Sequence, residues 1–216
     1  MDVFVIANQK GGVGKSTIAA NLAVAAETAG KGPAVLIDTD PQGTLSAWWN
    51  VRESKMPAFS PTTIEELPEK LRDLEAAGYS VAVIDTPPAI TEAIRTVVAK
   101  AHLVVIPVRP SPHDLRAVGS TVELVQSEGK PFVFALTQAK ANTRLTVSGV
   151  ASLSAHGMVA PAIIHDRVDY AGSMIDGRTV QETDPKGRRA VEMTELWKFV
   201  QARIAKSTKA RKVENR

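Results

Sequence analysis

The sequence has 216 residues, 44% of them hydrophobic and 23% charged, with a formal net charge of +3 and no cysteine. This composition is that of a folded globular protein, and it excludes disulfides, thiolate metal sites and iron–sulfur clusters held by this chain. No apolar run approaches the roughly 20 residues of a membrane-spanning helix, and the start lacks the features of a signal peptide, so a cytoplasmic location is expected.

Six short apolar runs, rich in Val and Ile, predict strands along the chain. In chain order they occupy residues 3–7, 34–38, 81–85, 103–107, 132–136 and 159–164. Helix-like segments lie between and after them, at residues 15–29, 63–77, 90–100, 112–127, 143–156 and 186 to about 205. Continuously apolar strands that alternate with helices are typical of a sheet covered on both faces. The expected fold class is therefore α/β, a single-domain, doubly wound, mostly parallel sheet with helices on both faces.

Turn residues mark the ends of several of these helices. Glycines that could act as C-terminal caps stand at positions 30, 32, 78 and 129. Ser111 stands where an N-cap is expected. Residues 50–62 form the least regular insertion, and residues 206–216 are expected to be a basic, flexible tail that follows a domain spanning residues 1–205.

The loop between the first strand and the first helix is rich in glycine. It reads Lys10, Gly11, Gly12, Val13, Gly14, Lys15, Ser16 and Thr17. Glycines allow successive backbone N–H groups to line an anion site, to which the following helix adds its positive end. Lys15 can then reach the β- and γ-phosphates, and the Ser16 hydroxyl can bind Mg²⁺. The loop therefore predicts a site for a nucleoside triphosphate.

This loop departs from the usual P-loop pattern, because Gln9 occupies the position of the first glycine. With the additional Lys10, it resembles the deviant Walker A box of the ParA and MinD class of ATPases. The resemblance implies a P-loop ATPase that uses Mg²⁺ to hydrolyse ATP to ADP and phosphate. It also implies that residues 10–17 surround the nucleotide and that Lys10 and Lys15 take part in catalysis.

Two acidic segments end apolar strands, at the edge where an open parallel sheet binds its ligands. Asp85 is expected to hold Mg²⁺ through water as a Walker B acid, although it could instead only cap the next helix. By resemblance, Asp40 positions the attacking water, and Asp38 is a supporting acid near the metal. Taken alone, the segment from Asp38 to Gly43 favours a simple turn.

The expected assembly depends on Lys10. In the resembled family the corresponding lysine contacts the phosphates bound by the partner subunit, which implies a homodimer that forms on ATP binding and separates after hydrolysis. An exposed lysine beside glycines is otherwise a solvated charge. The segment 107–114 resembles a loop and helix beside that dimer interface, and Asp166 and Arg167 fall where the family encloses the adenine.

Within the family, the chain looks like the small ParA-like partition and positioning ATPases, since it is expected to lack an N-terminal helix-turn-helix domain. Those ATPases bind non-specific DNA as ATP dimers. They are released when a separately encoded ParB-like activator or cargo adaptor stimulates hydrolysis. The resemblance therefore implies DNA partition or cargo positioning, with the protein associated with the nucleoid.

The charge distribution fits an anionic partner. Residues 186–216 hold ten Lys or Arg and three Glu, a net charge of +7, which leaves −4 on residues 1–185. Non-specific DNA binding needs only cations that face phosphates. The candidates are Lys140, Arg144, Arg178, Lys186, Arg188 and Arg189. Each of them alone is more typical of a solvated surface charge.

Two other functions remain open at this stage. A MinD-like membrane-cycling ATPase needs a terminal amphipathic helix that inserts into lipid. The apolar stripe of residues 193, 196, 197, 200 and 204 is instead expected to pack on the protein body, which disfavours membrane binding. A metabolic ATP-dependent ligase or transferase would need a second substrate site, and no such constellation stands out.

Overall fold

Six parallel strands form one sheet in this computed structural model, which describes residues 1–89, 91–166 and 168–214. The strands are β1 (Asp2–Ile6), β2 (Ala34–Asp38), β3 (Ala58–Pro61), β4 (Val81–Asp85), β5 (Leu103–Val108) and β6 (Phe132–Leu136). Their order across the sheet is β3-β2-β4-β1-β5-β6, and each pairing is parallel. The expected doubly wound α/β fold is confirmed.

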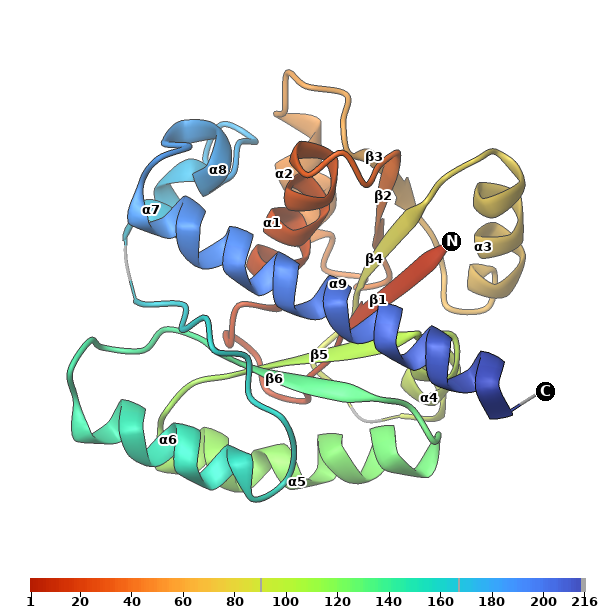
Figure 1. Ribbon diagram of the computed structural model, residues 1–216. Helices are drawn as coiled ribbons and strands as arrows, with labels where there is room; N and C mark the ends of the chain where they lie inside the picture. The colour runs from red at the N-terminus through yellow and green to blue at the C-terminus, as the bar shows by residue number, and fades with distance from the viewer. Residues whose placement is uncertain (90, 167, 215–216) are drawn as a thin grey trace.

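Helices cover both faces of this sheet (Figure 1). They are α1 (Lys15–Thr28), α2 (Thr44–Asn50), α3 (Leu67–Ala76), α4 (Glu92–Ala99), α5 (Pro112–Ser127), α6 (Arg144–Ser154), α7 (Val168–Ser173), α8 (Val180–Thr183) and α9 (Arg188–Glu214). Alternate residues of β1 face two separate cores. Phe4 and Ile6 pack with residues of α1 and α9, whereas Val3 and Val5 pack with residues of α4 and α5. Burial on both faces explains why the strands are continuously apolar.

The predicted helix ends are confirmed at most positions. Gly30, Gly78 and Gly129 have φ angles of +65°, +90° and +61° directly after α1, α3 and α5, whereas Gly32 has no positive φ. The Ser111 hydroxyl accepts a hydrogen bond from the Asp114 N–H at 3.2 Å and caps α5. These residues therefore stop and start helices by the expected local chemistry.

The prediction of a strand at residues 159–164 is wrong. This segment runs beside β6 but forms only isolated bridges, from Val159 to Phe134 and from His165 to Ala139. Pro161 lies in the middle of the segment and has no N–H to donate, so a continuous ladder cannot form there. Apolar residues on either side of Pro161, such as Ala160 and Ile164, are still buried, and this apolar composition makes the sequence look like a strand.

The insertion at residues 50–62 is more regular than expected, because it contains the edge strand β3, which pairs with β2 from Val35 to Asp38. This strand is short, partly exposed and ends in proline, features that weaken a sequence signal for a strand. The helices α2, α7 and α8 were not expected either. They have seven, six and four residues, too few to establish a helical period.

Helix α9 is longer than expected, because it continues to Glu214 and does not end near Ala205. Its apolar stripe is buried, as predicted: Trp197 is 2% exposed, and its ring lies 5.5 Å from that of Phe4 in β1. Figure 1 shows α9 crossing the sheet beside α1. None of the helices in the described part of the chain has the length and apolar composition of a membrane span.

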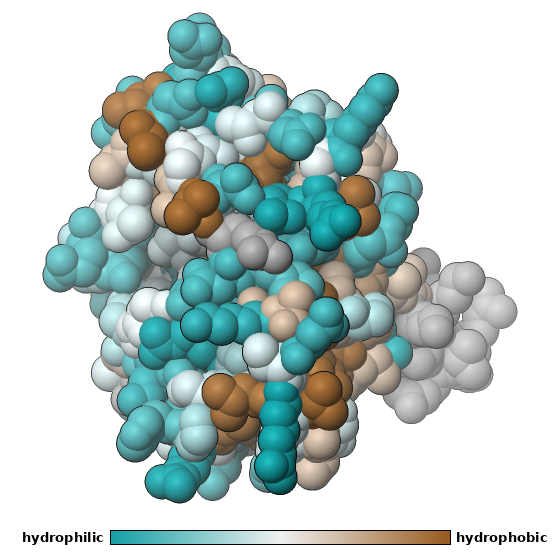
Figure 2. Space-filling view, turned by 90° about the vertical axis from the view of Figure 1, so that its left-hand side faces the viewer, coloured by the Kyte–Doolittle hydropathy of each residue, from teal (hydrophilic) through white to brown (hydrophobic). Residues whose placement is uncertain are grey.

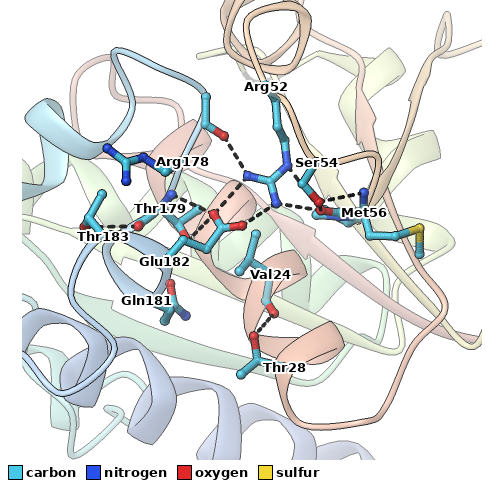
Figure 3. A network of polar contacts seen from close by, with 12 residues as sticks. Val24, Thr28, Arg52, Ser54, Met56, Arg178, Thr179, Gln181, Glu182 and Thr183 are labelled. Carbon is cyan, nitrogen blue, oxygen red and sulfur yellow. Dashed lines mark hydrogen bonds and ion pairs between the residues drawn. The ribbon is translucent and has the colours of Figure 1, made fainter.

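A partly buried ion pair joins the segment after α2 to the start of α8 (Figure 3), since the Glu182 side chain is 27% exposed. The Arg52 side chain is 2% exposed, and its guanidinium donates to both Glu182 carboxylate oxygens, at 2.6 and 2.9 Å. It also donates to the backbone oxygens of Gly177, at 2.6 Å, and of Met56, at 2.6 and 3.1 Å. We call these four residues the Arg52 clamp. Since Glu182 also accepts a bond from the Thr179 N–H at 2.9 Å, the clamp fixes the capped start of α8.

Candidate functional site

The parallel sheet brings the predicted acidic residues together. Asp38 ends β2 and Asp85 ends β4, and the two are direct partners in the register of these neighbouring strands. On its other side β4 pairs with β1, where Ile6 is opposite Asp85, so the glycine-rich loop that follows β1 lies at the same edge. Sequence positions 6, 38 and 85 therefore meet because the carboxyl ends of parallel strands share one edge.

The glycine-rich loop is held by two residues that follow strand β6. Gly12 and Gly14 have φ angles of +71° and +88°, conformations that other residues rarely adopt, and Gly14 is the N-cap of α1. The Thr137 hydroxyl donates to the Val13 oxygen at 2.9 Å, and the Gln138 amide donates to the Gly12 oxygen at 2.6 Å. No motif in the sequence indicates these two supports, because they follow a strand more than 120 positions later.

Lys15 lies inside the loop, with only 8% of the residue exposed. Its ammonium donates to the backbone oxygen of Lys10 at 3.2 Å. Burial lowers the pKa of Lys15, and the charges of Asp85 and Asp40 oppose this shift. The ammonium is therefore dehydrated and close to two acids, a setting in which it binds an added anion strongly.

Ser16 and Asp85 form the second part of the site. The Ser16 hydroxyl donates to Asp85 Oδ2 at 2.6 Å, and the Thr86 N–H donates to Oδ1 at 3.1 Å. Asp85 is 1% exposed, and this burial raises its pKa to about 7 although the bond from Ser16 acts in the opposite direction. A hydroxyl and a carboxylate that lacks a paired cation are the oxygen ligands that Mg²⁺ prefers, so these residues fit the metal.

Asp38 and Asp40 differ in their surroundings. Asp38 is buried and accepts hydrogen bonds from the N–H groups of Asp40, at 3.0 Å, and Ser46, at 3.2 Å, while burial raises its pKa. Asp40 is half-buried and accepts a bond from the Gln42 N–H at 3.0 Å. The alternative expectation of a turn is therefore met, and the same turn directs the more accessible carboxylate toward a cavity of about 610 Å³.

No three His, Cys, Asp or Glu side chains within residues 1–89, 91–166 and 168–214 form a complete metal cage. A magnesium ion that this chain holds would therefore need phosphate and water oxygens in addition to those of Ser16, Asp38 and Asp85. Such shared coordination is usual for Mg²⁺ in nucleotide sites.

A second cavity, of about 200 Å³, lies beside the loop on the side of α7. Its lining includes Gly14, Thr17, Gln138, His165, Asp166 and Tyr170. Asp166 lines this cavity, and its contact with adenine stays a prediction, whereas Arg167 is outside the described residues. Glu192 of α9 holds this wall, because it accepts a bond from the Tyr170 hydroxyl at 2.8 Å and contacts His165 Nδ1 at 2.9 Å. Sequence reasoning missed this support, since it joins distant segments.

The predicted DNA-binding cations fall into two groups. Lys140 and Arg144 are exposed at the start of α6, whereas Arg178, Lys186, Arg188 and Arg189 flank α8 and the start of α9. Arg178 pairs with Asp176 at 2.6 Å, and Arg189 pairs with Asp169 at 2.9 Å. The face in Figure 2 is mostly hydrophilic, with separated apolar side chains. Five of these cations are exposed and Arg189 is half-buried, and their contact with DNA stays a prediction.

Comparisons with known proteins agree with this geometry. The family model described as the CobQ/CobB/MinD/ParA nucleotide binding domain matches residues 4–180. A relative from Gloeobacter kilaueensis, "Maintenance of carboxysome distribution protein A", is 44% identical over 123 residues, which span 56% of this chain and 55% of that protein. The "Chromosome-partitioning ATPase Soj" of Thermus thermophilus is 29% identical, over 92% of this chain and 95% of its own.

Solved structures share the fold. The septum site-determining protein MinD from Pyrococcus horikoshii, complexed with Mg-ADP, is similar with a TM-score of 0.77 and 16% sequence identity. The match covers 92% of this chain and 95% of that one. The arrangement of sheet and helices is therefore one that other chains use around a magnesium nucleotide.

Proposed function

Because the chain belongs to the CobQ/CobB/MinD/ParA family of nucleotide-binding domains, we propose that it is a Mg²⁺-dependent ATPase that dimerises on ATP and positions a cargo on non-specific DNA. One observation carries this proposal: Lys15, Ser16 and Asp85 converge at a single sheet edge, with Asp40 beside them. Such a set combines a phosphate-binding cation, two metal ligands and an acid that can orient water.

Each residue has a separate task in the proposed hydrolysis. Lys15 exchanges its hydrogen bond with the loop carbonyl for one with the β- and γ-phosphates. Ser16 and Asp85 hold Mg²⁺, which when bound neutralises charge on the phosphate oxygens. Asp40 accepts a hydrogen bond from water and aligns it with the γ-phosphorus, while Asp38 fixes the Asp40 backbone.

The proposed dimer depends on Lys10, which is half-buried at the outer side of the loop and lines a cavity of about 460 Å³. If its ammonium contacts the triphosphate of a second copy, each nucleotide neutralises charge from both subunits. Hydrolysis and loss of the γ-phosphate remove part of that attraction, so the nucleotide controls the assembly.

The proposed matrix is DNA, bound by the exposed cations near α6, α8 and α9. The buried stripe of α9 supports DNA over a membrane, because those apolar side chains are already packed in the core. The cargo is a large assembly or a DNA molecule, joined through an adaptor encoded by another chain. The printed names of the two relatives, one for carboxysome distribution and one for chromosome partitioning, suggest these classes.

The test is sedimentation velocity of the protein and of Lys10→Ala, each with and without ATP, Mg²⁺ and a random-sequence DNA duplex. The native protein should dimerise with Mg-ATP, and that dimer alone should sediment with DNA. DNA binding should weaken steeply between about 50 and 200 mM salt, since it rests on phosphate contacts. Lys10→Ala should bind ATP but remain monomeric and lose hydrolysis.

Lys31→Ala is the matched control, because Lys31 is an exposed lysine in the turn after α1. It should behave like the native protein. An ATP-bound Lys10→Ala variant with a normal dimer would refute the proposed assembly. Salt-insensitive binding to DNA, or flotation of the ATP form with anionic liposomes in place of DNA binding, would refute the proposed matrix.

A further inference from the structure

A second cation lies beside the glycine-rich loop, on the segment between β5 and α5. Arg109 donates from Nε and Nη2 to the two carboxylate oxygens of Asp114, at 3.0 and 3.1 Å. Asp114 is 3% exposed, and its carboxylate also accepts a hydrogen bond from the Ser111 hydroxyl. The backbone N–H of Asp114 donates to the same hydroxyl oxygen at 3.2 Å. A two-point bond to a fixed carboxylate sets the plane and the direction of the guanidinium.

The third nitrogen of this guanidinium faces the loop. Nη1 of Arg109 lies 4.0 Å from the point that a Cβ on Gly12 would occupy. Within the described part of the chain, Nη1 has no hydrogen-bond partner, whereas the other two nitrogens are both engaged. Two N–H groups of a fixed arginine therefore remain available next to the most open part of the phosphate loop.

Arg109 and Lys15 differ in their exposure beside the loop. Lys15 is buried within the loop, whereas the Arg109 side chain is 37% exposed and lines the cavity of about 460 Å³ together with Lys10. Gly11 and Gly12 are exposed at the same place. Arg109 and Lys10 therefore line one cavity at the surface of the subunit, where an anion held by another molecule would meet both cations.

The simpler explanation is that Arg109 only neutralises the buried Asp114. The Arg109 side chain is 37% exposed, so water screens this ion pair and its contribution to stability is small. Neutralisation needs only a positive charge, which lysine also carries, and it does not require Nη1 to face the loop. Asp114 engages Nε and Nη2 of the guanidinium, and Nη1 keeps its N–H groups for another acceptor. This arrangement allows an arginine to present donors to a phosphate.

We propose that Arg109 donates from Nη1 to the triphosphate held by a second copy of this chain, with Asp114 as the positioning residue that directs it. The inference rests on the proposed ATP dimer, and it adds a guanidinium to the contact already assigned to Lys10. The ligand class is a nucleoside triphosphate. Loss of Arg109 should slow hydrolysis at the partner's site by at least about 10-fold, because a charge-stabilising donor is removed.

The test pairs two defective variants so that one site in the mixed dimer is complete. Arg109→Ala keeps its own Asp40, and Asp40→Ala keeps its Arg109. When they are mixed with Mg-ATP, the nucleotide on the Arg109→Ala subunit meets its own Asp40 and the partner's Arg109. Turnover of the mixture should therefore exceed the sum of the separate variants, approaching about one quarter of the native rate for random pairing of equal amounts.

A doubly substituted chain, Arg109→Ala with Asp40→Ala, mixed with the Arg109→Ala variant, serves as the control and should show no recovery. Arg116→Ala, at an exposed arginine of α5, should keep the native rate. Arg109→Lys keeps the ion pair with Asp114 but loses the free donors, so it should be as slow as Arg109→Ala while unfolding like the native protein.

Two results would overturn the inference. A mixed dimer that forms normally but shows no recovery means that Arg109 does not act across the interface. Native turnover in Arg109→Lys means that the residue only neutralises Asp114. Both outcomes leave an ATP dimer of the native protein intact, so they are distinct from failure of the proposed function, in which the native protein itself forms no dimer with Mg-ATP.

Discussion

Two regions of the molecule bury charged side chains, and they treat those charges differently. In the Arg52 clamp, each guanidinium nitrogen has a partner, and the carboxylate of Glu182 lies against the cation. The second region is the edge of the sheet beside the glycine-rich loop, with Lys15, Asp38 and Asp85, which we call the loop edge. These three side chains are buried, yet in the ranges that the structure describes no salt bridge joins any of them to an opposite charge.

The pKa directions agree with this difference. Burial raises the pKa of Asp38 and Asp85 and lowers that of Lys15, so each of these groups is less stable in its charged form. The clamp is complete as the chain folds, whereas the loop edge leaves charges that a ligand can satisfy. Unpaired buried groups that cost stability are typical of sites built to bind something.

The largest expected effect comes from breaking the clamp. Arg52→Met should lower the free energy of unfolding by about 3 kcal/mol, because it leaves the partly buried Glu182 carboxylate without its cation and the Gly177 carbonyl without a donor. Urea denaturation measures this loss. Arg72→Met, at an exposed arginine of α3, should change stability by less than about 0.5 kcal/mol.

A second substitution sharpens this prediction. Adding Glu182→Gln to Arg52→Met should restore part of the lost stability, since the unpaired charge is then removed. If the urea midpoint of Arg52→Met equals that of the native protein, the ion pair between Arg52 and Glu182 does not stabilise the fold as proposed.

The next effect is the stabilisation expected when a ligand binds the unpaired charges of the loop edge. Mg²⁺ with a non-hydrolysable ATP analogue, at about 100 times its Kd, should raise the free energy of unfolding by about 2.7 kcal/mol. Arg52→Met should gain a similar increment, because the clamp lies apart from the loop and the two effects should add. Lys15→Ala should gain almost nothing. Equal ligand stabilisation of Lys15→Ala would contradict the assigned site.

The smallest effect concerns the ligand-free loop edge. Asp85→Asn should stabilise the protein at neutral pH by on the order of 1 to 2 kcal/mol, because it removes a buried charge. The folded pKa of Asp85 is raised from 3.8 to about 7, so the native penalty is absent at acidic pH and grows as pH rises between these values. Urea midpoints across this pH range should fall more steeply for the native protein than for Asp85→Asn. Parallel profiles would disprove the assignment.

The sequence predicted most of the loop edge because its parts are local. The glycines, Lys15 and Ser16 are consecutive, and Asp38 and Asp85 each end a strand of a parallel sheet, whose edge brings them together. One register rule was therefore enough to join three segments. The structure shows these residues close together, while the roles assigned to Lys10, Lys15, Ser16, Asp38, Asp40 and Asp85 all stay predictions.

The parts that escaped prediction depend on contacts between distant positions. Arg52 and Glu182 are 130 residues apart, and either alone looks like a surface charge. Thr137 and Gln138, which follow β6, hold the loop with no motif of their own. The strand predicted at residues 159–164 is absent for a different reason. The segment has the apolar composition of a buried strand, but Pro161 lacks the N–H group that a continuous ladder needs.

The hydrogen bond from the Lys15 ammonium to the carbonyl of Lys10 also affects how fast and how tightly a ligand can bind. A free lysine side chain that becomes ordered on binding loses about 2 kcal/mol of conformational entropy. Here the chain itself already imposes that order, so an incoming anion meets an ammonium that is preorganised and needs only to change acceptors. Recognition can therefore proceed without a search among side-chain rotamers, and affinity is limited by the phosphates and not by the lysine.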